Sequence, residues 1–196
     1  MTATQRPSGQ RPQKTIYVSF SAEINTNTTE ALISTMAECA KQRANEVRLL
    51  FSSGGGNVMH GINIYNVLRG LPFRLVTHNV GNVDSIGNAI FLAGEDRYAC
   101  PHSTFMFHGV SYPFTGDVNL GAKQLRETLA SVEADEARIG LIIQERSKLN
   151  ETQTRTFFGD AHTMGATEAL SVGIVHEIKD VQIPHGSTVV TLMFQR

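Results

Sequence analysis

The sequence is poor in features that mark several specialised protein classes. It contains no tryptophan, two cysteines and six prolines in 196 residues, and its formal net charge is −1 with an isoelectric point near 6.7. A charge this small excludes the global basic field typical of a nucleic-acid-binding domain. There is no apolar run of about 18 residues and no apolar signal segment near the start, so we expect neither a membrane span nor secretion.

Metal and nucleotide motifs are also missing. Cys39 and Cys100 are far apart in the sequence, no Cys-x-x-Cys pair is present, and the histidines show no paired spacing typical of metal ligands. Neither a G-K-[ST] motif nor G-x-G-x-x-G ahead of a helix occurs. We therefore predict no metal and no cofactor, and two thiols in a reducing, cytoplasmic compartment.

What the chain does have is enough apolar content for one folded domain. Hydrophobic residues make up 41% of the sequence and charged residues 18%, which suffices for a substantial core. Residues 1–14 are rich in proline, glutamine and arginine, and we expect them to form a flexible N-terminal arm. Residues 15–196 are predicted to form a single domain.

Strand and helix patterns alternate along this domain. Strands are predicted at 16–20, 47–51, 74–77, 97–100, 104–107, 174–178 and 189–194. Helices are predicted at 28–43, 58–71, directly after Ser85, 120–149, 151–158 and 166–172, the long one containing Gly140. This order predicts an α/β fold with parallel strand pairing.

Three short segments contain residues that are suited to catalysis. Ser85 lies in GNVDSIG at 81–87, ahead of an apolar run, and a glycine turn, SGGGNV, occupies 53–58. His108 ends an apolar strand-like segment. Taken singly, Ser85 is more often a helix N-cap and His108 more often a structural histidine. Together they favour a serine hydrolase, because acyl transfer needs a presented serine, a base and free backbone amides.

The ordered set of motifs resembles the ClpP family of caseinolytic serine proteases. The segments that carry the resemblance are SGGGNV at 53–58, SIG at 85–87, FLAG at 91–94, MFH at 106–108 and TMGATEA at 163–169. The resemblance implies a crotonase-like spiral of β-β-α units with a protruding long helix, or handle. It also implies a serine endopeptidase that cleaves peptides or unfolded proteins inside a homo-oligomeric chamber, a heptameric ring or a tetradecamer.

The same resemblance assigns roles to individual residues. Ser85 is expected to be the nucleophile and His108 its general base, while the amides of Gly56 and Ile86 form the oxyanion hole. The position of the family's triad acid falls on Ala161. The neighbouring carboxylate, Asp160, is therefore the predicted acid.

Some residues depart from the family pattern. Asp84 stands beside the nucleophile, where the family commonly has a small residue, and Gly109 follows the histidine where the family usually has glutamine. The polar arm does not resemble the axial-loop region that family members use with their unfoldase, which argues against a Clp-type ATPase partner. Two alternatives stay open: a catalytically weak or inactive ClpP-like scaffold subunit, and a crotonase-like acyl-CoA enzyme.

Overall fold

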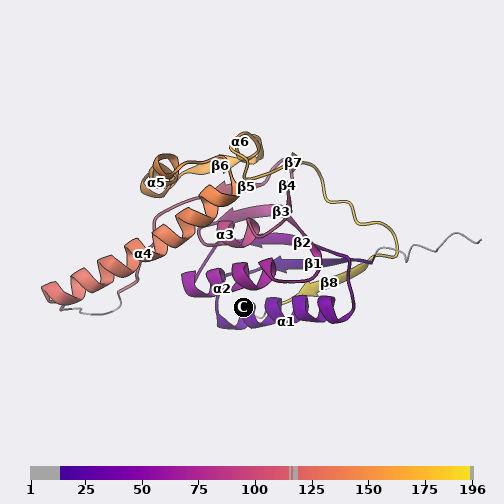
Figure 1. Cartoon of the computed structure of the whole chain (residues 1–196), viewed down its shortest axis with the longest axis horizontal. Helices are drawn as coiled ribbons and strands as arrows, with labels where there is room; N and C mark the ends of the chain where they lie inside the picture. The colour runs from indigo at the N-terminus through magenta and orange to yellow at the C-terminus, as the bar shows by residue number, and fades with distance from the viewer. Residues whose placement is uncertain (1–13, 115, 117–118, 195–196) are drawn as a thin grey trace, which may run out of the picture.

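A twisted sheet with helices packed around it organises the fold (Figure 1). The computed structural model describes residues 14–114, 116 and 119–194, so the predicted arm, apart from Lys14, lies outside the described residues. Within them the strands are β1 (Thr15–Ser21), β2 (Glu46–Ser53), β3 (Arg74–Asp84), β4 (Asp96–Ala99), β5 (Thr104–Met106), β6 (Thr163–Gly165), β7 (Glu177–Ile178) and β8 (Thr188–Leu192). The helices are α1 (Thr26–Lys41), α2 (Val58–Arg69), α3 (Gly87–Phe91), α4 (Ala122–Arg146), α5 (Glu151–Asp160) and α6 (Ala166–Ser171).

Strand pairing is mostly parallel, as the alternation of strands and helices predicts. The order is β6-β5-β3-β2-β1-β8, with β4 beside β3 and β7 beside β4. Strand β6 pairs antiparallel with β5, and the sequence analysis did not predict it, because three residues are too few to show an alternating pattern. Strand β7 is also shorter than the predicted 174–178.

Strand β3 is longer than predicted and carries the chain to Ser85. The sequence indicated residues 74–77, whereas the strand continues to Asp84. Its first part pairs with β4 and its last part with β5, where Asp84 lies opposite Met106. Residues 79–84 lack a regular apolar pattern, but strand pairing satisfies their backbone hydrogen-bonding groups. This extension brings Ser85 next to the end of β5.

The main core lies between the sheet and helices α1, α2 and α3. Alternate residues of β1 and β2 enter it, and the rings of Phe20 and Phe51 stack with their centroids 5.5 Å apart. Their sequence neighbours point to the other face of the sheet, since strand side chains alternate. Helix α1 begins at Thr26, two residues earlier than predicted, because Asn25 and Thr28 form a capping box.

Helix α4 projects away from the sheet (Figure 1, orange). Gly140 does not interrupt its 25 residues, because the glycine is buried beside Thr154 of α5 and this packing offsets its low helix propensity. The side chains of Leu125 and Leu129 are 53% and 56% exposed. No helix within the described residues is both long and apolar enough to cross a membrane.

Two arginines join the base of α4 to the segment that follows Ser85. Arg146, the last residue of α4, donates to the carbonyls of Leu92 at 3.1 Å and Gly94 at 2.8 Å. Buried Arg97 donates to the Arg146 carbonyl at 2.8 Å. Burial, with the nearby Arg146 charge adding to it, lowers the pKa of Arg97 to about 10. These contacts fix the position of α4 relative to α3.

Candidate active site

Ser85 occupies a tight turn between β3 and α3. The strand ends at Asp84 and the helix begins at Gly87, so the chain reverses its course within two residues. The φ angle of Ser85 is 56°, in the left-handed region that residues other than glycine rarely adopt. A serine on a strained strand-to-helix turn is the arrangement that presents a nucleophile in hydrolases.

Asn88 holds this turn against the end of β5. The Ser85 N–H donates to the Met106 carbonyl at 2.8 Å. The Asn88 side-chain amide donates to the Met106 carbonyl at 2.8 Å and to the Ser85 carbonyl at 3.1 Å. Both acceptors are carbonyls, which fixes the orientation of the amide group. The sequence analysis missed Asn88, although its position three residues after a turn serine was a readable signal.

The glycine turn packs directly against the Ser85 side chain. Gly55 has a φ of 88°, and a Cβ atom there would lie 2.7 Å from Ser85 Cβ and 3.3 Å from Ser85 Oγ. Gly56 has a φ of 141°, and a Cβ there would lie 2.3 Å from the Ile24 carbonyl oxygen. Both positions therefore require glycine, because a side chain would collide and because the backbone conformation is unfavourable for other residues.

The two amides predicted to form the oxyanion hole have no partner in the described part of the chain. The hydrogen bonds recorded there use neither the Gly56 N–H nor the Ile86 N–H as a donor. Next to Gly56, the Gly55 carbonyl and the Asn57 N–H bond to Ile24 instead. Ile86 is buried against Gly61 of α2, where a Cβ would lie 2.1 Å from Ile86 Cγ1. Both donors are thus held beside Ser85 and left free.

His108 lies just beyond β5, between two backbone contacts. Its neighbours Phe107 and Gly109 donate their N–H groups to the carbonyls of His162 at 2.8 Å and Phe158 at 3.0 Å. The His108 Nδ1 atom is 2.7 Å from the Gly109 carbonyl oxygen. Because a carbonyl only accepts, Nδ1 carries the proton and Nε2 keeps its lone pair. This tautomer is the one that a general base for serine requires.

The predicted triad acid, Asp160, lies at the surface of the molecule. Asp160 is the last residue of α5 and is exposed, and Ala161 after it takes a left-handed conformation with φ 50°. Among the described residues its carboxylate makes no recorded hydrogen bond to His108. The assignment of Asp160 as the triad acid therefore stays a prediction.

Two other groups near the site are engaged elsewhere. The Asp84 carboxylate accepts from Asn82 Nδ2 at 2.5 Å. The His162 ring stacks on Phe157 with centroids 4.3 Å apart, and its Nε2 lies 2.7 Å from Glu168 Oε1. Among the described residues, neither side chain is hydrogen-bonded to the His108 ring.

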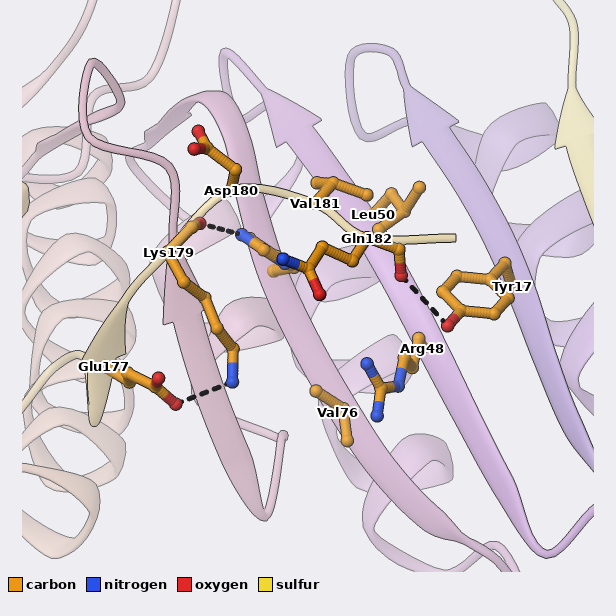
Figure 2. Close-up of a pocket in the computed structure, with 10 residues that line it drawn as sticks. Tyr17, Arg48, Leu50, Val76, Glu177, Lys179, Asp180, Val181 and Gln182 are labelled. Atoms are coloured by element: carbon orange, nitrogen blue, oxygen red, sulfur yellow. Dashed lines mark hydrogen bonds and ion pairs between the residues drawn. The ribbon is translucent and has the colours of Figure 1, made fainter. Parts of the chain in front are cut away.

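Two cavities lie in different parts of the molecule. One, of about 900 Å³, lies between α4 and α5 next to the candidate site and includes Gly109 and Glu136 in its lining. The other, of about 350 Å³, lies on the sheet face away from the core, under the segment that contains Lys179 and Gln182 (Figure 2). Ser85 and His108 line neither of these two cavities.

The two cationic side chains that line the second cavity, Lys179 and Arg48, each pair with a carboxylate. Lys179 Nζ lies 2.6 Å from Glu177, and Arg48 Nε lies 2.6 Å from Glu46. The Tyr17 hydroxyl donates to the Gln182 carbonyl at 3.1 Å (Figure 2). In the described part of the chain, no group of three or more His, Cys, Asp or Glu residues is arranged to hold a metal ion.

Comparison with known proteins places this arrangement in a family. The Clp protease family model matches residues 9–182, and the chain belongs to this family. It is 30% identical over 141 residues to ATP-dependent Clp protease proteolytic subunit 2 of Chlamydia trachomatis, covering 68% of this chain and 64% of the relative. It is 29% identical over 143 residues to the proteolytic subunit of Deinococcus radiodurans, covering 69% and 65%. The chain thus spans a little under two thirds of these relatives.

A solved structure supports the fold. A ClpP1 mutant from Listeria monocytogenes superposes with a TM-score of 0.74 and 22% sequence identity, covering 85% of this chain and 92% of that chain. The likeness confirms the predicted α/β class, and the crotonase-like arrangement is consistent with it.

Proposed function

We propose that this chain is a serine endopeptidase with Ser85 as nucleophile and His108 as base. The observation that carries the proposal is the Ser85 turn, bonded to Met106 two residues before His108 and packed against Gly55. One strained serine is thereby held beside a histidine segment and a glycine turn. Membership of the Clp protease family supports the same chemistry.

The geometry suggests the following steps. The Ser85 Oγ atom attacks the carbonyl carbon of the peptide bond as its proton passes to His108 Nε2. The tetrahedral oxyanion accepts hydrogen bonds from the Gly56 and Ile86 amides, which need no reorganisation to receive it. As the C–N bond breaks, the Nε2 proton goes to the leaving amine. Water, deprotonated by the same nitrogen, then releases the acyl group from Ser85.

Substrate and assembly follow from family membership and from α4. We infer peptides or unfolded proteins as substrates and a homo-oligomer, a heptameric ring or a tetradecamer, as the working form. The exposed Leu125 and Leu129 lie one helical turn apart on α4 and favour a contact between subunits. The free thiols of Cys39 and Cys100 support the inference of a reducing, cytoplasmic compartment.

The proposal is tested with purified protein and a fluorogenic dipeptide, with casein as a second substrate. We expect cleavage by the wild type, fluorophosphonate labelling of Ser85, and loss of both in Ser85→Ala. Ser34→Ala, which changes an exposed serine on α1, is the matched control and should stay active. Cleavage that persists in Ser85→Ala would contradict the assignment of the nucleophile.

One observation favours a second candidate function. Asp160 is exposed and, among the described residues, makes no hydrogen bond to His108, as expected for a weak or inactive scaffold subunit that assembles with an active partner. An assembled wild-type oligomer that neither cleaves any substrate nor reacts with fluorophosphonate would support this alternative over the peptidase.

A further inference from the structure

A chain of hydrogen bonds leads from His108 to a carboxylate on α4. The His108 Nδ1–H group donates to the Gly109 carbonyl at 2.7 Å. The Val110 N–H donates to Glu136 Oε1 at 2.9 Å. The Gly109 carbonyl and the Val110 N–H belong to the same peptide group. A single planar amide therefore connects the imidazole to the Glu136 carboxylate.

This connection has an electrostatic consequence. The peptide bond is a resonance system in which electron density is shared between nitrogen and oxygen. An anionic acceptor on the N–H draws the amide toward its charge-separated form, which makes the carbonyl oxygen a stronger acceptor. The bond to Nδ1–H then strengthens when Nε2 takes up a proton and the ring becomes positive. The Glu136 charge would thus strengthen the hydrogen bond of His108 without contacting the imidazole.

The residue after the histidine fits this role. A Cβ atom on Gly109 would lie 2.7 Å from Glu136 Oε1, so a side chain there would displace the carboxylate. The Gly109 N–H also bonds to the Phe158 carbonyl of α5 at 3.0 Å. The peptide segment is therefore held from α5 as well as from α4. Glycine at this position, a departure from the family pattern, allows the close approach of Glu136.

The surrounding charges leave Glu136 available for this contact. The cavity between α4 and α5 is lined by Glu133 and Glu136 from α4 and by Glu151 and Arg155 from α5. Arg155 is the cation among these lining residues, and it bonds to Glu151 at 2.8 Å. The acidic residue of β3 is Asp84, and its carboxylate accepts a hydrogen bond from Asn82.

We propose that Glu136, acting through the Gly109–Val110 peptide group, orients His108 and stabilises its protonated form in place of a directly bonded acid. The inference rests on the proposed function, with His108 as the base. Glu136 does not touch the reacting atoms and is a positioning residue. The reaction it supports is proton transfer from Ser85 Oγ to His108 Nε2.

The test compares three substitutions, each of which replaces one carboxylate by its neutral amide. Glu136→Gln keeps an oxygen acceptor for Val110 and removes the charge, Glu133→Gln removes a neighbouring charge from the same cavity, and Asp160→Asn removes the sequence-predicted acid. We expect Glu136→Gln to lower kcat about tenfold, with an unchanged KM, because a hydrogen bond to a charged acceptor is replaced by one to a neutral acceptor. The acidic limb of its pH–rate profile should move to lower pH, because the imidazolium is less stabilised. Glu133→Gln should resemble wild type, and any loss in Asp160→Asn should be smaller than the loss in Glu136→Gln.

The possible outcomes distinguish a failure of this inference from a failure of the proposed function. A wild type that neither cleaves nor labels at Ser85 overturns both. An active wild type with unchanged kcat and pH profile in Glu136→Gln, or an equal loss in Glu133→Gln, overturns the role of Glu136 alone. Loss in Asp160→Asn with normal Glu136→Gln would restore Asp160 as the acid. Sedimentation and circular dichroism check assembly and folding. If Glu136→Gln misfolds, Glu136→Asp, which withdraws the carboxylate by one methylene, should show the same loss in kcat, and wild-type kinetics there overturn the inference.

Discussion

The two halves of the candidate site are held by different kinds of contact. On the Ser85 side, Ile86, Gly87 and Asn88 are buried, and Gly55 and Gly56 leave no room for a side chain. On the other side, His108 is half-buried next to a cavity of about 900 Å³. Close packing therefore fixes the nucleophile. The base is held by backbone hydrogen bonds to α5 and its C-terminal loop and, through the next peptide group, by the flexible Glu136 side chain.

The largest expected effect comes from disturbing the rigid half. Gly55→Ala would place a Cβ 2.7 Å from Ser85 Cβ and force a side chain onto a φ of 88°. The same Cβ would also lie 2.9 Å from the Asp84 carbonyl oxygen, so it meets backbone and not the end of a flexible side chain. We expect a loss of about a hundredfold or more in kcat/KM, as for nucleophiles displaced by about 1 Å.

Its matched control is Gly54→Ala in the same turn. Gly54 has no atom within 4 Å of an added Cβ and no left-handed backbone conformation. Peptidase assays on both variants make the comparison. Similar peptidase activities of Gly55→Ala and Gly54→Ala would show that the glycine turn can shift easily. This result would contradict the rigidity of the Ser85 half.

This contrast also explains what the sequence could predict. The Ser85 turn and the glycine turn are local, since each is encoded in about six consecutive residues whose sterics can be read directly. The patterned strands β1 and β2 and the patterned helices α1 and α2 were predicted for the same reason, with shifts of a few residues at their ends. Family membership, inferred from these motifs in order, is confirmed by the family model that matches residues 9–182.

The surroundings of His108 could not be predicted in the same way. Glu136 lies 28 residues beyond His108, and its contact depends on how α4 packs beside the 109–110 peptide. Spacing from the family pattern indicated position 161, next to Asp160, but the end of α5 and the left-handed Ala161 decide where the Asp160 carboxylate lies. Strand β6, which positions this region, is three residues long. Long-range packing rather than local pattern determines these features.

A second substitution tests the softer half. Gly109→Ala would place a Cβ 2.7 Å from Glu136 Oε1, the far end of a flexible side chain that can swing aside. The expected loss in kcat is therefore smaller than for Gly55→Ala, roughly tenfold, as the Val110 N–H loses its charged acceptor. Gly159 lines the same cavity, and no atom lies within 4 Å of a Cβ added there. Gly159→Ala should therefore keep wild-type kinetics. A hundredfold loss in Gly109→Ala would mean that this half is as rigid as the other.

The smallest expected effect concerns β3, the strand that presents Ser85. His78 is buried on the face opposite the core, and its Nε2–H donates to the Lys179 carbonyl at 2.9 Å. Burial lowers the pKa of His78 below its usual value. As the pH falls through about 6.5, the unfolded chain takes up a proton before the folded protein does. The free energy of unfolding therefore falls with pH until the lowered pKa is reached.

His78→Gln removes this titration and keeps a donor for the Lys179 carbonyl. Its thermal unfolding midpoint should therefore depend less on pH than that of the wild type, between about pH 7.5 and about pH 5 at one protein concentration. Some slope remains, because burial also lowers the pKa of His176. His185→Gln, which changes an exposed turn histidine, should keep the wild-type slope. If His78→Gln also keeps the wild-type slope, groups outside β3 cause the destabilisation by acid, and the role assigned to His78 is wrong.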